Sequence, residues 1–366
     1  MSYITAIGTA VPTHRFDQAT IGSFMERMMT LDETARRKLR AVFRASGIEH
    51  RHSVLADYGR TSAFEFYPND NAGRFPSTES RMNVFRQNAL PLSLHAVEDL
   101  RSQHGNFNVS SVTHLIVVCC TGMYAPGLDI ELVRALKLKT TVERTSITFM
   151  GCYAAFNAMK AANAFCATDP DAKVLIVCTE LCSIHFQDAM TEDNLLANTL
   201  FADGSAALLV EATSMRARRF KLSAFHSDLA LSGENDMAWS IGDLGFEMKL
   251  TAYIPSIIRG GIQTLTQALL NKTGTSLNEI RYFALHPGGV KILEAIEQSL
   301  ELPKEKNEFS YRVLRCYGNM SSPTVLFVLR EIFDIMKQDD HQKRVLGMAF
   351  GPGLTLESMI LEMEVS

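Results

Sequence analysis

SITFMGCYAAFNAMKAANAFCATDPDAKVLIVC, residues 146–178, is the strand–helix–strand unit that decides the fold. Residues 146–150 and 172–178 are short runs rich in apolar and β-branched side chains, and each predicts a buried strand. The segment between them, from residue 152 to about 168, is rich in Ala and Met and predicts a helix. Strands joined through a helix are typical of a parallel sheet that is covered by helices.

The same alternation continues on both sides of this unit. Further strands are expected at 3–9, 114–120, 281–285 and 344–350. Helices are expected within 17–46 and at 81–104, 130–138, 254–270, 290–300 and 321–336, with a loop at 65–80. The pattern predicts an α/β protein with a mostly parallel sheet. Because the two parts contain β/α units of similar number, we expect two similar halves, residues 1–215 and 216–366.

Composition excludes several classes of protein. The 366 residues are 46% hydrophobic, which is ample for a large core and excludes wholesale disorder. The net charge of −4 argues against a nucleic-acid binder held by a global positive field. No apolar run approaches the ~20 residues of a membrane helix, and the first residues do not resemble a signal peptide. Seven cysteines without paired spacing suit reduced thiols in a cytoplasmic protein.

The first candidate for chemistry is Cys152. It follows the expected strand and Gly151, and it opens the expected helix. The positive end of the helix dipole lowers the pKa of a thiol and favours the nucleophilic thiolate, so this position suits acyl transfer. A buried structural cysteine remains the alternative.

Three further motifs lie at the ends of expected strands or starts of expected helices. ALHPGG (284–289) places His286 at the carboxyl end of a strand, where ligands of α/β sheets gather. CYGNMSSPTVLFVL (316–329) places Asn319 just before an apolar helix, and GPG (351–353) forms a turn. Alone, these motifs also fit a structural histidine, a helix cap and a plain turn. Together with Cys152 they form a set that accepts an acyl group and stabilises an enolate and an oxyanion.

In joint spacing, this sequence resembles the type III polyketide synthases, the chalcone synthase-like family. The resemblance is carried by GCYAAF at 151, LFADGSAALLV at 200, ALHPGG at 284, YGNMSSPTVLFVL at 317 and GMAFGPGLTLE at 347. It implies a thiolase-like fold of two duplicated βαβαβ-type halves in α-β-α-β-α layers. It also implies that Cys152, in the first half, is the acyl-accepting nucleophile, and that His286 and Asn319, in the second, are the donor pair.

The resemblance also implies a substrate pocket. Phe201 matches the aromatic gatekeeper between the CoA tunnel and the elongation cavity, and Met248 stands where the family has a second phenylalanine. Other residues match positions in or beside the cavity: Cys120, Thr121, Ala197, Ser321, Gly351, Pro352 and Gly353. Met248 makes a softer wall than phenylalanine and inclines the expected starter toward fatty acyl groups.

A basic segment matches the family's site for the phosphates of CoA. Lys38 aligns directly, whereas Arg40 and Arg44 are each one residue from the two other basic positions, a displacement of ~100° around a helix. Gly288 and Lys291 are further candidates for CoA contact. A solvated charged face is the alternative reading of this segment. No four-ligand metal pattern is present, and no metal is expected.

The expected function is therefore that of a homodimeric synthase without a bound cofactor. It would load an acyl-CoA starter on Cys152, extend it by repeated decarboxylative Claisen condensation with malonyl-CoA, and release a pyrone, a resorcinol or a related phenolic. Two alternatives remain: a ketoacyl synthase that makes one condensation with acyl-carrier-protein thioesters, and a catalytically silent partner subunit. No nucleic acid and no membrane span are expected.

Overall fold

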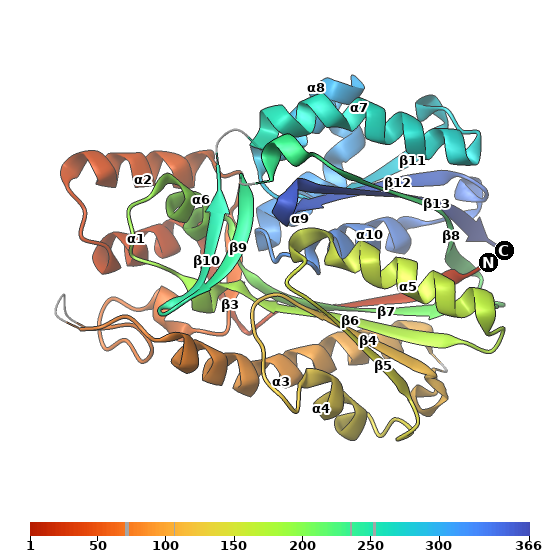
Figure 1. Cartoon of the computed structure of the whole chain (residues 1–366), viewed down its shortest axis with the longest axis horizontal. Coiled ribbons are helices and arrows are strands. Elements are labelled where there is room, and N and C mark those ends of the chain that lie inside the picture. Colours follow the sequence, from red (N-terminus) through yellow and green to blue (C-terminus); the bar gives the residue numbers. More distant parts are fainter. Residues whose placement is uncertain (70–72, 106, 235, 252–253) are drawn as a thin grey trace.

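The computed structural model describes residues 1–366 except 70–72, 106, 235 and 252–253, and shows a mixed α/β protein (Figure 1). Its strands are β1 (Tyr3–Ala10), β2 (His14–Asp17), β3 (His50–Ser53), β4 (His114–Cys119), β5 (Glu143–Thr148), β6 (Lys173–Leu181), β7 (Asp203–Glu211), β8 (Arg218–Leu229), β9 (Met237–Gly242), β10 (Gly245–Leu250), β11 (Ile280–Leu285), β12 (Arg344–Gly351) and β13 (Thr355–Val365). Its α-helices are α1 (Gln18–Met28), α2 (Glu33–Ala45), α3 (Thr78–His104), α4 (Leu128–Ala135), α5 (Ala154–Thr168), α6 (Glu192–Leu200), α7 (Ile254–Thr273), α8 (Val290–Leu300), α9 (Glu308–Tyr317) and α10 (Thr324–Ile335).

The main sheet contains one strand pattern twice. Within the described residues, nine strands form it in the order β11-β12-β13-β8-β1-β7-β6-β4-β5. Counted outward from the centre of the sheet, one side has the strands β1-β7-β6-β4 and the other has β8-β13-β12-β11. On each side the first two pairings are antiparallel and the third is parallel. The strand pattern is therefore present once in residues 3–211 and once in residues 218–365.

The expectation of a mostly parallel sheet is wrong. Of the eight strand pairings in this sheet that the described residues make, three are parallel. A continuous apolar run reports that both faces of a strand are covered, and it does not report strand direction. β7 shows this, because it is buried along its whole length yet pairs antiparallel with both of its neighbours.

Helices α5 and α10 form the middle layer, between the two halves of the sheet (Figure 1). They share one core cluster with strands of both halves. Helices α3 and α4 cover one outer face, and α7 and α8 cover the other (Figure 1). The buried side of α5 carries four alanines, which let neighbouring backbones approach closely. The structure therefore has helix and sheet layers in alternation.

The helices expected within 17–46 are α1 and α2, and α2 starts where Asp32 accepts a hydrogen bond from the Ala35 N–H at 2.7 Å. Other local expectations differ from the structure. β5 is an edge strand whose side chains are largely exposed. Helices α6 and α9 and the β9–β10 hairpin were not expected. In the expected loop 65–80, residues 70–72 lie outside the described residues, and α3 begins within it.

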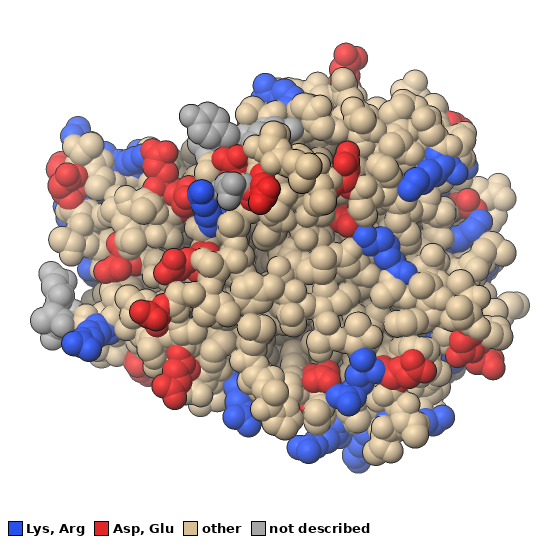
Figure 2. Space-filling view, viewed as in Figure 1, with Lys and Arg blue, Asp and Glu red and all other residues tan. Residues whose placement is uncertain are grey.

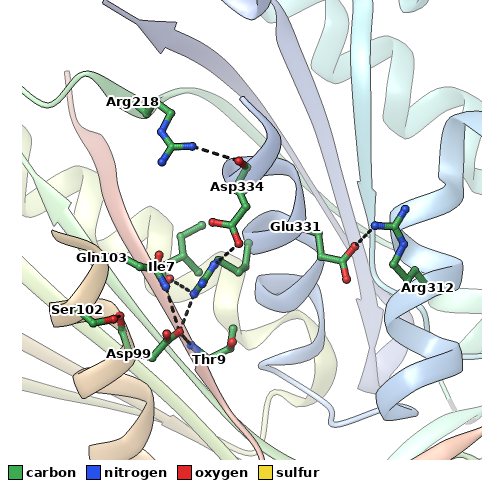
Figure 3. A network of polar contacts seen from close by, with 10 residues as sticks. Ile7, Thr9, Asp99, Ser102, Gln103, Arg218, Arg312, Glu331 and Asp334 are labelled. Atoms are coloured by element: carbon green, nitrogen blue, oxygen red, sulfur yellow. Dashed lines mark hydrogen bonds and ion pairs between the residues drawn. The ribbon is translucent and has the colours of Figure 1, made fainter. Parts of the chain in front are cut away.

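A polar network bonds to backbone groups of β1 beyond the point where β1 stops pairing with β8 (Figure 3). Only Tyr3 and Ile4 of β1 pair with β8. Further along, Arg330 of α10 donates to the Ile7 carbonyl at 2.9 Å and to Asp99 Oδ2 at 2.6 Å. The same carboxylate oxygen accepts from the Thr9 N–H at 2.8 Å. Side chains of α3 and α10 thus satisfy backbone groups that would otherwise be unpaired.

The surface in Figure 2 mixes basic and acidic side chains, with no broad basic area on the face shown. None of the helices in the described part of the chain is long and apolar enough to cross a membrane.

Two glycine substitutions are expected to change stability in opposite directions. A Cβ at Gly8 would lie 2.1 Å from the Ala96 carbonyl oxygen, so Gly8→Ala forces β1 away from α3 and should lower the free energy of unfolding by about 3 kcal/mol or more. Gly260, exposed inside α7, has open space at its Cβ position, so Gly260→Ala should raise that free energy by about 0.5–1 kcal/mol. Denaturant titration measures both, and equal effects would contradict this packing.

Candidate active site

Cys152 lies in a tight turn between β5 and α5. Gly151 has φ of 76°, and a Cβ there would lie 2.4 Å from Pro352 Cδ, so only glycine fits this turn. A Cβ on Gly351 would in turn meet the ring of Tyr153 at 2.5 Å. The Gly351-Pro352 loop therefore packs directly behind the nucleophile turn, and it holds the turn in place rather than lining the pocket.

The thiol of Cys152 contacts the segment that precedes α10. Its Sγ lies 4.0 Å from Asn319 Oδ1 and 3.7 Å from Ser321 Oγ. Burial raises the pKa of the Cys152 thiol to about 11, and the contacts with Ser321 and Asn319 only partly offset this. The expectation that the helix start lowers this pKa is therefore wrong for the resting site, because desolvation outweighs the favourable contacts.

Asn319 has a fixed orientation. Its Oδ1 accepts hydrogen bonds from the Ser321 N–H at 2.8 Å and from Thr324 Oγ1 at 3.4 Å. Those donors hold the oxygen toward the start of α10, so the Nδ2 protons remain available for a ligand. The side chain is buried and lines an apolar pocket. Asn319 is thus placed as a donor.

His286 lies in the same pocket at the end of β11. Its backbone N–H donates to the Met348 carbonyl at 2.8 Å, which continues the pairing of β11 with β12. Neither ring nitrogen has a hydrogen-bond partner among the described residues. Burial lowers the pKa of His286 to about 3, so its imidazole is neutral, with one nitrogen able to donate and the other able to accept.

The pocket that His286 and Asn319 line has a volume of about 220 Å³. Most of its wall is hydrocarbon, from α6, α7, the β9–β10 hairpin and the start of α8. The site residues expected from the sequence that the structure brings to this wall are Phe201, Met248, Gly288 and Lys291, besides His286 and Asn319.

Phe201 and Met248 separate this pocket from a smaller inner chamber, because both side chains line both spaces. The inner chamber has a volume of about 30 Å³, and Ala197 and Trp239 are among its walls. In this conformation it holds little more than a water molecule. An acyl chain that enters it must displace Phe201 or Met248.

Cys120 and Thr121 do not line either space. Thr121 Oγ1 donates to Glu180 at 2.7 Å, and the Cys120 carbonyl accepts from Trp239 Nε1 at 2.9 Å. Cys120 Sγ accepts from the Gly151 N–H at 3.0 Å, so it lies beside the nucleophile turn. Cys120 and Thr121 therefore support the residues of the site through hydrogen bonds and do not face the substrate spaces.

The expected CoA-binding residues on α2 divide between two faces of the helix. Val42 and Ala45 line the pocket, and Lys38 lies one turn before Val42 on the same face, paired with Glu192 at 2.5 Å. Arg40 is held by Glu26 at 2.5 Å, and Arg44 Nε donates to the Arg40 carbonyl. The structure does not bring Arg40 or Arg44 to the pocket, because a shift of one residue turns a side chain onto another face.

Glu180 is a site-supporting residue that was not singled out from the sequence. It is fully buried, and its carboxylate accepts from Thr121 Oγ1, from the Cys120 N–H at 2.9 Å and from Ser322 Oγ at 2.6 Å. Burial raises the pKa of this carboxyl group. A single acidic residue in the otherwise uncharged run VLIVCTEL was the available signal. Within the described residues, no three His, Cys, Asp or Glu side chains gather as a metal site would require.

Two family models match the chain. The model of the N-terminal domain of chalcone and stilbene synthases matches residues 1–214, and that of the C-terminal domain matches residues 223–364. A curated relative, probable polyketide synthase 1 of Dictyostelium discoideum, is 30% identical over 99% of this chain. The match covers only 11% of that much longer protein. An alpha-pyrone synthesis polyketide synthase-like protein of Mycobacterium tuberculosis is 27% identical over 99% of this chain and 91% of its own.

Solved structures agree with these matches. PKS-I from the brown alga Ectocarpus siliculosus superposes with a TM-score of 0.92 at 28% identity, over 99% of this chain and 98% of that one. This likeness confirms the thiolase-like fold, and the family models confirm the resemblance identified from the sequence motifs. The chain therefore belongs to the chalcone and stilbene synthase family, the type III polyketide synthases, and is an acyl-transferring condensing enzyme.

Proposed function

We propose that this enzyme loads an acyl-CoA starter on Cys152, extends it repeatedly with malonyl units, and cyclises the product to a pyrone, a resorcinol or a related phenolic. The proposal is supported by the arrangement of Cys152, Asn319 and His286. A buried thiol lies 4.0 Å from Asn319 Oδ1, and Asn319 lines an apolar pocket together with an unpartnered, neutral His286.

Loading requires that the thiol lose its proton. In the resting site Cys152 and His286 share no hydrogen bond, so the neutral imidazole, which has a free lone pair, accepts this proton only after substrate binding has brought the two side chains together and raised the basicity of the ring. The thiolate attacks the thioester carbonyl of the starter, the carbon–sulfur bond to CoA breaks, and the CoA thiol leaves with a proton. The acyl group is then held as a thioester on Cys152.

Extension uses the same donors on malonyl-CoA. The N–H of His286 and the Nδ2 of Asn319 hold the thioester oxygen of the malonyl group. The bond to the carboxylate breaks, CO₂ leaves, and the electron pair forms an enolate whose oxygen these two donors stabilise. The enolate carbon attacks the acyl thioester on Cys152, a carbon–carbon bond forms, and the thiolate is expelled. No redox or metal cofactor is needed, since loss of CO₂ drives the condensation.

The wall of the pocket supports an aliphatic starter. Its residues are mainly hydrocarbon, and Lys291 is the one side chain there with a full charge among the described lining residues. Burying a charged or strongly polar starter group against this wall would leave it without partners. Whether the starter chain is short or long depends on how far Phe201 and Met248 move.

We also propose that two copies form a homodimer. The edge strand β5 carries exposed side chains, and no strand of the described chain pairs beyond it, so a second copy can cover it. Light scattering on the purified enzyme should give twice the 40.7 kDa mass of one chain, and a monomer mass at micromolar concentration contradicts the proposal.

Product analysis tests the chemistry. Wild-type enzyme with malonyl-CoA and a panel of short, long-chain and aromatic acyl-CoAs should give polyketides, most with aliphatic starters, whereas Cys152→Ala should give none because no acyl thioester forms. Mass spectrometry measures both. One condensation, seen only with an acyl-carrier-protein thioester, would identify a ketoacyl synthase instead. Absence of product with every donor would identify a silent partner subunit.

The pH dependence of thiol alkylation tests the resting protonation state. Because the pKa of Cys152 is raised to about 11, the thiolate fraction should increase about tenfold for each pH unit between 7 and 10. The iodoacetamide rate at the Cys152 peptide should follow it without a plateau. Ser321→Ala should slow alkylation at each pH, because the Ser321 contact lowers this pKa. A plateau that begins below pH 8 would instead indicate a thiolate paired with protonated His286.

A further inference from the structure

The carboxyl end of α6 carries Phe201, and its carbonyl groups are satisfied by side chains from distant segments. The last carbonyls of a helix have no partner within the helix. Here Arg51, from β3, donates from Nη1 to the Asn198 carbonyl at 2.8 Å and to the Phe201 carbonyl at 2.7 Å. Its positive charge meets the negative end of the α6 dipole.

The two remaining carbonyls have equally specific donors. Gln18 Nε2 donates to the Thr199 carbonyl at 2.8 Å, and Gln18 Oε1 accepts from Arg51 Nε at 2.8 Å. The Leu200 carbonyl accepts from the Asn319 N–H at 2.9 Å. The end of α6 is therefore joined to α1, to β3 and to the segment that carries Asn319.

A single peptide group connects Arg51 to Asn319. The carbonyl of the Phe201–Ala202 peptide accepts from Arg51, and the N–H of the same peptide donates to the Asn319 carbonyl at 2.9 Å. Hydrogen bonds in such a chain polarise one another. The stem of Arg51 also packs against the residue before Asn319, since a Cβ on Gly318 would lie 2.9 Å from Arg51 Cγ.

The burial of the Arg51 charge is unfavourable for the stability of the fold. Arg51 is 4% exposed, no carboxylate forms an ion pair with it among the described residues, and its Nη2 has no acceptor there. A buried cation without a carboxylate in contact is unfavourable for stability unless dipoles compensate it. The carbonyls of α6 supply that compensation.

We propose that Arg51 is a positioning residue that sets the Phe201 gate and the Asn319 donor together, through the Phe201–Ala202 peptide. The expected change in kcat rests on the proposed function, whereas the expected change in backbone order rests on the hydrogen-bond geometry alone. Loss of Arg51 frees both the gate and the donor, whereas loss of Gln18 removes the partner of Arg51 Nε and loosens this peptide only indirectly.

The test compares Arg51→Met with the wild-type enzyme and with Arg330→Met, which breaks the polar network of Figure 3 away from both spaces. Arg51→Met should lower kcat for polyketide formation about 10- to 100-fold, because small displacements of reacting groups are costly, while KM changes little. The share of shortened products should rise.

The control variant Arg330→Met should lower the melting temperature and leave kcat and product lengths unchanged. Arg51→Lys should recover part of the rate, because one nitrogen makes both carbonyl contacts.

Hydrogen exchange gives a readout that does not depend on turnover. The amides of Ala202 and Asn319 should exchange about tenfold faster or more in Arg51→Met than in wild type or Arg330→Met, since both amides belong to the linked backbone. Unchanged exchange and kcat within threefold of wild type would overturn the proposal, as would the same changes in Arg330→Met. If Arg51→Met does not fold, Gln18→Met takes its place, with a smaller effect in the same direction and the same criterion. A wild-type enzyme without polyketide product refutes the proposed function, and exchange still decides the role of Arg51.

Discussion

The starts of α5 and α10 lie against each other, and the rest of the site depends on this contact. Both helices precede equivalent strands of the duplicated pattern, β6 and β12, and both occupy the middle layer. Their first turns therefore meet between the two halves, with the thiol of Cys152 3.7 Å from Ser321 Oγ. The Gly351-Pro352 loop fixes one of these turns from behind, and Glu180 joins the other, through Ser322, to the end of β4. Chemistry is placed where the duplication brings two helix starts together.

Burial sets the protonation state of the resting site. The same desolvation raises the pKa of Cys152 and lowers that of His286, so both side chains are neutral before substrate arrives. The fixed positive charges nearby are on other side chains: Lys291 lines the pocket, and Arg51, whose partners are the carbonyls at the end of α6, lines the inner chamber. An apolar pocket with neutral reactive groups suits a thioester, which brings no charge of its own to the reacting carbonyl. The donors gain strength when charge develops on that oxygen, because little water is present to compete.

The sequence was sufficient for the fold class and for the residues at turns, and insufficient for residues placed by tertiary packing. Cys152, His286 and Asn319 stand beside Gly or Pro at element ends, so local chemistry was enough to select them. Arg40 and Arg44 were misplaced because the rotation of α2 about its axis is fixed by the burial of Leu39 and Phe43, which turns both arginines away from the pocket. The raised pKa of Cys152 depends on packing by distant segments, which no local pattern reports, and the only sequence signal for Glu180 was one acidic residue in an apolar run. The prediction of parallel strands failed for the same reason, since a buried apolar run does not show whether the neighbouring strand runs parallel or antiparallel to it.

The end of α6 also has a consequence for how the enzyme matures during synthesis. Gln18 and Arg51 leave the ribosome early, whereas Asn319 follows more than 250 residues after Arg51. The Leu200 carbonyl has no partner until that late segment arrives, and the thiol of Cys152 has no amide beside it. Chains are made and fold from the N-terminus onward. A nascent first half therefore has the thiol without Asn319 and His286, so the proposed acyl transfer requires that the second half has docked.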